Sequence, residues 1–191
     1  MKAKLWVIIG VLIIGSVMMV APVLAATSGT TAITGNPAAT VALTTVGSIA
    51  DKILVPGTTV TDSTTSLTVN CNIPTGYTIE VTDVIAGKPA GSGGKMVETT
   101  DGTIYVDPNP KVLATAMSVN VPDDADYYTH ASKTLSSAAS SGFISSADAH
   151  HVVADKSITL TFSQPVSFAD TVLSGGHKYR IVVQFDIAAK T

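Results

Sequence analysis

Cysteine is almost absent from the chain, since Cys71 is the only one among 191 residues. A lone cysteine excludes an intramolecular disulfide, and two interpretations of Cys71 stay open. It alternates in phase with Leu67 and Val69, which indicates packing in an apolar core, where free cysteine behaves as a small hydrophobic residue. Alternatively, it forms a disulfide with a second subunit, as a leftover cysteine in an exported protein can.

Tryptophan and charged residues are also scarce. The one tryptophan is Trp6, and Lys, Arg, Asp and Glu together make up 13% of the chain. Without further tryptophans we do not expect a carbohydrate-binding platform, because such surfaces usually rely on exposed Trp or Tyr rings. The formal net charge of −3, without basic clusters, argues against nucleic acid and anionic lipid as partners, since both are bound through Lys and Arg.

Catalytic motifs are missing as well. No serine has the surroundings of a nucleophile elbow, and no Asn-x-Ser/Thr sequon for N-glycosylation occurs. The glycine-rich stretch 91–94 lacks the spacing of a phosphate or dinucleotide loop and the helix that should follow it. We therefore expect no enzymatic activity and, calcium apart, no cofactor.

The long apolar run of the sequence stands at its N-terminus. Two lysines precede an apolar stretch over residues 5–20, and Val23 and Ala25 occupy the −3 and −1 positions of a small-residue cleavage site. This order is typical of a secretory signal peptide over residues 1–25. It predicts a secreted, extracellular or cell-surface protein whose mature chain begins at Ala26.

Two other interpretations of the N-terminal segment stay open. If it is retained, residues 5–24 are long enough to span a bilayer, and the lysines would remain in the cytoplasm. The protein would then contact the membrane only through this segment. A pilin-type leader, cut before the apolar run, needs a basic-glycine junction, which Lys4-Leu5-Trp6 does not supply.

The residues from Ala26 to Pro37 are small, polar and rich in threonine. One interpretation is a flexible lead-in to the folded domain. The other is an extended N-terminal arm that pairs with an edge strand of a neighbouring subunit. In this second interpretation Thr30 and Ile33 are candidate assembly residues, together with Cys71.

Behind the arm, short alternating runs are separated by turn residues, which is the pattern of an all-β chain. Apolar and polar residues alternate over 66–73 and 77–85, and Pro74-Thr75-Gly76 between them predicts a β-hairpin over residues 67–82. The last expected strand carries five alternating apolar residues and is the expected central strand. We predict a single domain over residues 38–191, an antiparallel β-sandwich of about seven to nine strands. Further strands are expected over residues 112–121 and 157–163, and the last, central strand is expected over residues 178–188.

Two stretches interrupt this rhythm. Residues 86–101 are glycine-rich and charged, which indicates a long exposed loop. Residues 123–156 begin with an acidic tract and continue through a Ser/Ala-rich part. We interpret them as one long insertion with room for a short helix near residues 131–140. Loops of this length in a compact domain often carry function.

The two ends of this insertion contain the candidate metal ligands. Asp123, Asp124 and Asp126 offer carboxylates of the kind that calcium prefers. His150 and His151 offer imidazoles suited to zinc or a similar ion. The acidic tract lacks EF-hand spacing, and adjacent residues of a strand point to opposite faces, so the two histidines would not easily share one ion. Exposed side chains of a solvated loop are the alternative interpretation.

The order of arm, strands and closing segments resembles that of a group of surface proteins. The Thr-rich arm ends in Ile33-Thr34-Gly35-Asn36-Pro37, the alternating runs extend from Leu67 to Thr82, and the closing segments are 163–166 and 179–183. The chain resembles secreted β-sandwich surface proteins of methanogenic archaea, and it is similar to the bacterial WxL-type and TasA/camelysin-like wall and fibre proteins. The WxL-type tryptophan motif is absent, because no tryptophan follows Trp6. The resemblance implies a fibre-forming role.

Two functions follow as expectations. The first is a cell-surface structural protein that self-assembles into a sheath, pilus or surface layer, or that joins other cell-surface components. Export, Thr-rich strands, few charges and the arm at residues 26–37 favour it, because an exposed strand edge can pair with another chain. The second is a monomeric extracellular adhesin or ligand-binding module that uses loops 86–101 and 123–156.

Overall fold

Two long antiparallel strands, β2 (Thr59–Cys71) and β9 (Val153–Pro165), form the centre of the fold. β2 is rich in threonine, and both strands contain β-branched residues, which fit a pleated surface. In the second half of each strand, buried side chains alternate with partly or fully exposed ones. The apolar residues therefore share one face, as the two-residue period of a strand predicts.

This computed structural model describes residues 37–46, 48–49 and 51–191. The expected signal peptide over residues 1–25 lies outside the described residues, as does the N-terminal arm up to Asn36, with Thr30 and Ile33. Residues 38–191 group into one unit. Within the described ranges, we find no helix with the length and apolar character needed to cross a membrane.

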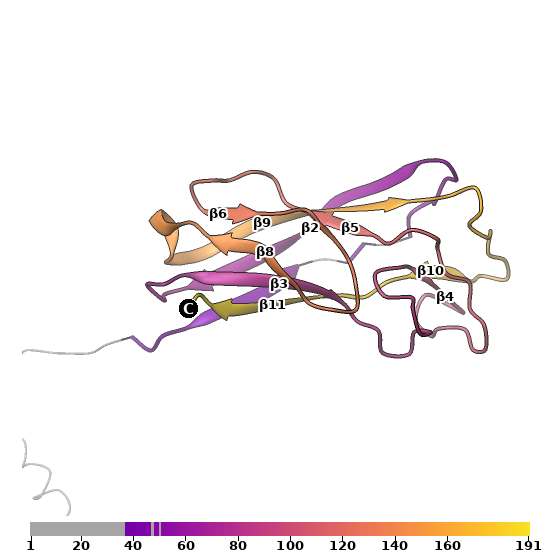
Figure 1. The fold of residues 1–191 in the computed structure, drawn as a ribbon, viewed down its shortest axis with the longest axis horizontal. Helices are drawn as coiled ribbons and strands as arrows, with labels where there is room; N and C mark the ends of the chain where they lie inside the picture. The colour runs from indigo at the N-terminus through magenta and orange to yellow at the C-terminus, as the bar shows by residue number, and fades with distance from the viewer. Residues whose placement is uncertain (1–36, 47, 50) are drawn as a thin grey trace, which may run out of the picture. The chain divides into compact units, whose positions relative to one another are not determined.

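The described residues contain eleven strands, arranged in three antiparallel sheets. The largest sheet has the order β1-β2-β9-β5-β7, the second has the order β11-β3-β8-β6, and β10 pairs with β4. In Figure 1, β4 and β10 lie at the opposite end of the unit from the C-terminus. The other strands are β1 (Val41–Val46), β3 (Tyr77–Asp83), β4 (Val97–Thr99), β5 (Ser118–Asn120), β6 (Tyr128–His130), β7 (Lys133–Thr134), β8 (Ser140–Ser146), β10 (Lys178–Arg180) and β11 (Val183–Ala189).

The apolar faces of the two larger sheets contribute to one hydrophobic core. Leu67, Ile158 and Leu160 come from the five-stranded sheet, and Tyr77 and Ile79 come from the four-stranded sheet. Full burial of one such side chain stabilises the fold by about 1.5–3 kcal/mol. The predicted all-β class and its antiparallel pairing are confirmed.

The strands outnumber the seven to nine that the sequence predicts. Five of them, β4, β5, β6, β7 and β10, contain only two or three residues. A strand this short shows no alternation that sequence reasoning can detect. The count was therefore too low because it rested on the long periodic runs alone.

The β-hairpin predicted over residues 67–82 is wrong. β2 lies between β1 and β9, whereas β3 lies between β11 and β8, so the two strands do not pair with each other. The turn that joins them contains Gly76, whose φ of 83° suits glycine. This turn leads the chain from one sheet to the other, and Cys71 and Tyr77 both enter the same core. Alternation shows which face of a strand is buried, but it does not name the strand's partner.

The long insertion predicted over residues 123–156 is also wrong. This stretch contributes β6, β7, β8 and the start of β9 to the sheets. Instead of a helix, residues 131–140 contain β7 and the beginning of β8, and the short helical turn of this region is a 3₁₀ turn at Asp148–His150. Phe143 and Ile144 are fully buried in β8 and fix this Ser-rich strand against β3.

The final strand differs from the expectation as well. Residues 178–188 divide into β10, which pairs with β4, and β11, which pairs with β3. Because β11 ends the order of its sheet, it is an edge strand and not the central one. Of the strand expected over residues 112–121, only β5 joins a sheet.

Leu67 offers a direct test of the core. It is fully buried on β2, opposite Ile158 of β9. Leu67→Ala should therefore lower the free energy of unfolding by about 2–5 kcal/mol, the usual cost of such a truncation. Thr68→Ala on the other face of β2 is the matched control and should change it by about 0.5 kcal/mol or less. Urea denaturation measures both, and equal effects would contradict the assignment of faces.

Candidate functional site

The five-stranded sheet is incomplete beside the first half of β2. β1 pairs only with residues 66–71 of β2, although β2 begins at Thr59. β9 pairs with most of residues 59–65 on one side, but on the other side no strand among the described residues does. This half of β2 is therefore an open sheet edge, with which a further strand can pair.

An apolar cleft of about 770 Å³ lies between this open edge and the segment that leads from β10 into β11. β2 contributes Val60 and Thr65, and the core residues Met117 and Phe162 also line it. β11 is itself an edge strand. The cleft thus has an unpaired strand edge on either side. The segment between β10 and β11 contributes Ile181, and β11 contributes Val183 and Phe185.

Strongly exposed apolar side chains occur in the segments that line this cleft. Val172 lines it and is 85% exposed. Phe168 and Ile53 are 85% and 84% exposed and stand within two residues of lining residues. A single exposed apolar residue is ordinary, but a group of them beside one concave surface indicates an interaction site.

Two polar atoms in the wall of the cleft have no hydrogen-bond partner in the part of the chain that the structure describes. Thr65 and Gln164 are almost fully buried. The side-chain amide of Gln164 donates hydrogen bonds to the carbonyls of Thr115 and Pro165, at 3.1 and 2.7 Å. Its Oε1 and the Oγ1 of Thr65 accept or donate none. Both atoms are closed off from solvent within the wall, an exception to the rule that buried polar atoms are satisfied.

Asp62 is a buried charge in the same wall. Its carboxylate pairs with Lys52 and accepts hydrogen bonds from the N–H and the hydroxyl of Thr64, at 2.9 and 2.5 Å. The bond from Lys52 and those from Thr64 lower the pKa of Asp62 from 3.8 to about 2, against the effect of burial. Because Lys52 precedes β2, this ion pair ties the β1–β2 connection to the sheet.

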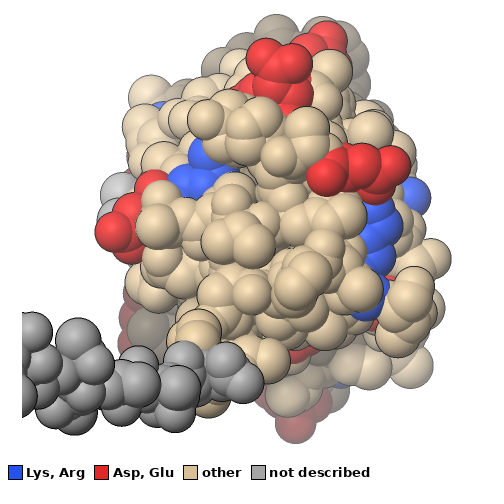
Figure 2. Space-filling model, turned by 90° about the vertical axis from the view of Figure 1, so that its left-hand side faces the viewer, with Lys and Arg blue, Asp and Glu red and all other residues tan. Residues whose placement is uncertain are grey.

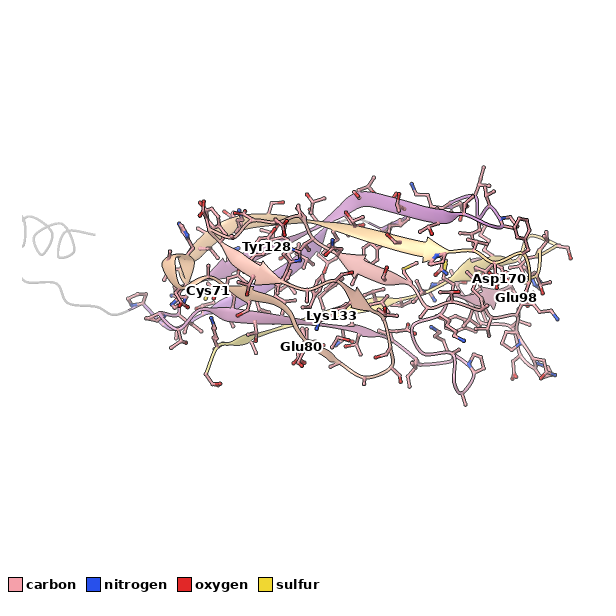
Figure 3. The ribbon with its side chains drawn as sticks, turned by 45° about the horizontal axis from the view of Figure 1, so that its top comes forward. Cys71, Glu80, Glu98, Tyr128, Lys133 and Asp170 are labelled. Carbon is pink, nitrogen blue, oxygen red and sulfur yellow. The ribbon has the colours of Figure 1, made fainter. Side chains whose placement is uncertain are left out.

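Charged groups also stand at the end of the cleft near β4 and β10. Glu98 accepts hydrogen bonds from Nδ1 of His177 at 2.6 Å and from the N–H of Lys111 at 2.8 Å. The bond from His177 is the main cause that lowers the pKa of Glu98. Lys178 pairs with Asp51 at 2.5 Å. Figure 3 shows Glu98 and Asp170 at this end of the unit.

The candidate metal ligands do not converge. Asp123 pairs with His130 at 2.7 Å, and Asp124 pairs with Lys156 at 2.6 Å. His150 bonds the carbonyl of Asp126, whereas His151 bonds the carbonyl of Pro74. Within the described part of the chain, no three His, Cys, Asp or Glu side chains come together as ligands would. The side chains of Asp123, Asp124, His150 and His151 thus each bond another part of the protein, whereas Asp126 takes part through its backbone carbonyl.

The face of the unit at its C-terminal end carries few charges. Figure 2 shows this face, where the uncharged surface is interrupted by small separate groups of acidic and basic side chains. The ring of His150 stacks on Tyr127 at 4.2 Å, and the ammonium of Lys156 lies 3.6 Å from the centre of the same tyrosine ring. These contacts give the histidine and the lysine structural roles at this end.

Among the predicted assembly residues, Thr30 and Ile33 lie outside the described residues. Cys71 is 3% exposed and is packed in the core cluster. Figure 3 shows Cys71 at the opposite end from Glu98, away from the β4–β10 pair. A buried thiol is poorly placed for a disulfide between subunits, so the geometry favours the core interpretation of this residue.

The sequence did not reveal the cleft. Its lining residues come from segments far apart in the chain, such as 48–65, 162–166 and 171–185. One local signal pointed to it: the apolar residues around Pro56-Gly57 do not alternate with polar ones, so they do not fit the buried face of a strand. No such signal pointed to Val172, because it lies in an irregular stretch without a motif.

Comparison with known proteins gives no further constraint: no family model, no curated protein and no solved structure matches the chain.

Asp62 predicts a pH dependence of stability. Its folded pKa of about 2 is below the ordinary value of 3.8, so the ionised group stabilises the fold above about pH 4 and this contribution is lost toward pH 2. Asp62→Asn lacks the contribution at every pH. The difference in free energy of unfolding between wild type and variant should therefore shrink from pH 4 to pH 2. Urea titrations measure it, and a constant difference over this range would contradict the ion pair.

Proposed function

We propose that the protein is a secreted cell-surface subunit that assembles with copies of itself by strand addition. In this proposal the N-terminal arm, residues 26–37, of one copy enters the apolar cleft of the next. The observation that carries the proposal is the cleft between the unpaired half of β2 and the edge strand β11. An added strand would gain main-chain hydrogen bonds from a sheet edge and apolar burial from the cleft.

The proposal also assigns an architecture. The two larger sheets act as the layers of a β-sandwich that lacks one strand at this edge. The apolar faces of both sheets already meet in one core. A strand placed against residues 59–65 would continue the order of the five-stranded sheet where β1 stops. Its inward side chains would cover Met117 and Phe162, which line the cleft.

The composition of the arm suits this cleft. Residues 26–37 contain no charged side chain and are small or β-branched, with Ile33 as the largest apolar residue. Charges would be expensive to bury in an apolar cleft. Threonine suits such a strand, because its β-branched side chain carries a methyl group that can be buried and a hydroxyl that can stay in a polar environment.

Secretion belongs to the same proposal. Removal of the expected signal peptide would leave Ala26 as the new terminus, with the arm directly before the first described residues. Assembly outside the cell would then begin only after cleavage. The alternative of a monomeric adhesin loses support from the geometry, because loops 86–101 and 123–156 contribute strands β4 and β6–β8 to the sheets.

Deletion of the arm tests the assembly. Mature protein beginning at Ala26 should form filaments or sheets, and the same protein without residues 26–37 should remain a folded monomer, because its cleft has no donor strand. Size-exclusion chromatography and electron microscopy measure the assembly, and circular dichroism checks the fold. A synthetic peptide of residues 26–37 should bind the shortened protein. Polymers that persist after the deletion would contradict the proposal, and a wild-type protein that stays monomeric would favour the adhesin.

Val172 tests the cleft independently of the arm. Its side chain lines the cleft but is 85% exposed, so Val172→Asp should leave the monomer as stable as wild type. The new charge should nevertheless weaken assembly at least tenfold, because binding would have to desolvate it. Val152→Asp, at a 59% exposed position outside the cleft, is the matched control. Assembly that responds equally to both substitutions would argue against this cleft as the interface.

A further inference from the structure

The loop after β3 encloses an ion pair that the assembly proposal does not use. Asp83 ends β3, and Lys88 follows it five residues later. Both side chains are 0% exposed, and Nζ of Lys88 lies 2.5 Å from Oδ2 of Asp83. When two opposite charges are fully removed from water, the cost of desolvating them usually exceeds their mutual attraction, unless every polar atom around them is hydrogen-bonded.

The hydrogen bonds around this pair are uneven. Oδ2 of Asp83 accepts from Lys88 and from the N–H of Gly94, the latter at 2.7 Å. Nζ of Lys88 also donates to the carbonyl of Lys95 at 2.7 Å. Oδ1 of Asp83 is buried and has no hydrogen-bond partner among the described residues. A carboxylate oxygen left alone in the protein interior is strongly unfavourable, and this oxygen points to a state other than the simple ion pair.

We propose that Lys88 and Asp83 condense into an intramolecular amide bond. Nζ of Lys88 gives up one proton to the carboxylate and attacks Cγ of Asp83 as a neutral amine. The new N–C bond forms, and the bond from Cγ to Oδ1 breaks. Oδ1 leaves with the transferred proton and a second proton from Nζ as one molecule of water. An ammonium and a carboxylate thus become an amide and water, without an oxidant or another reactant.

The product fits the existing hydrogen bonds. The oxygen that leaves is Oδ1, the one atom of the pair without a partner. The oxygen that stays, Oδ2, continues to accept from the N–H of Gly94. The N–H of the new amide continues to donate to the carbonyl of Lys95. Condensation therefore removes two buried charges and an unsatisfied atom while it keeps the bonds that hold the loop.

The surroundings favour the reaction. The fold holds amine and carboxyl in contact, which removes the entropic cost of bringing them together. The ring of Tyr105 packs close to Gly87, the residue before Lys88. A Cβ added to Gly87 would lie 3.3 Å from Cδ2 of this ring. A cavity of about 260 Å³, lined by Lys88, Gly93 and Ser136 among others, adjoins the lysine and can accept the released water.

Mass spectrometry of the mature, full-length protein tests this proposal without any substitution. Trypsin should cleave after Lys52 and Lys95 but not between Lys88 and Pro89, which yields one peptide that contains both partners. This peptide should be lighter than its sequence by one water molecule. Fragment ions should be missing between residues 83 and 88, because two bonds must break there to separate the parts.

Two variants serve as controls. Lys88→Arg keeps the charge but lacks the primary amine, so its peptide should have the full mass. If that variant fails to fold, the double variant Asp83→Met with Lys88→Met replaces the pair by apolar side chains of similar size and should also have the full mass. A wild-type peptide of full mass would overturn the proposal. So would a water loss that fragmentation places outside residues 83–88 or that persists in the variants.

Discussion

The antiparallel pairing of β2 with β9 is the interaction on which the rest of the structure depends. These strands of 13 residues each come from distant parts of the chain and place Leu67 opposite Ile158. A slip of one residue would turn the apolar face of either strand away from the core, so the buried residues fix the register. β1 and β5 then pair with the outer sides of this central pair, and β3 covers its apolar face through the shared core.

The cleft follows from the unequal lengths of neighbouring strands. β1 has six residues and β2 has 13, so β1 leaves the first half of β2 without a partner on that side. The Lys52–Asp62 ion pair holds the β1–β2 connection beside the open edge without filling the sheet. The backbone edge of β2 and the apolar surface of the cleft thus lie together at one place, and strand addition would use both.

The sequence predicted the all-β class and the buried faces of the long strands, because the alternation of residues such as Leu67, Val69 and Cys71 is a local property. It did not predict which strands pair. The turn at Pro74-Thr75-Gly76 is equally compatible with a hairpin and with a crossing between sheets, and only the contacts of β3 with β8 and β11 decide. The Ser-rich residues of β8 were mistaken for an insertion because two buried residues, Phe143 and Ile144, are too few to show a period. The cleft and the Lys88–Asp83 contact arise from tertiary packing, so no motif announces them.

The central claim is that the open half of β2 receives a strand from another copy of the chain. The most direct measurement is a structure of the assembled protein by electron cryomicroscopy, at a resolution that traces side chains. We expect residues 26–37 of one subunit to lie as a strand along residues 59–65 of its neighbour, between β2 and β11. A cleft that is empty in the assembly, or that is filled by the subunit's own residues, would contradict it.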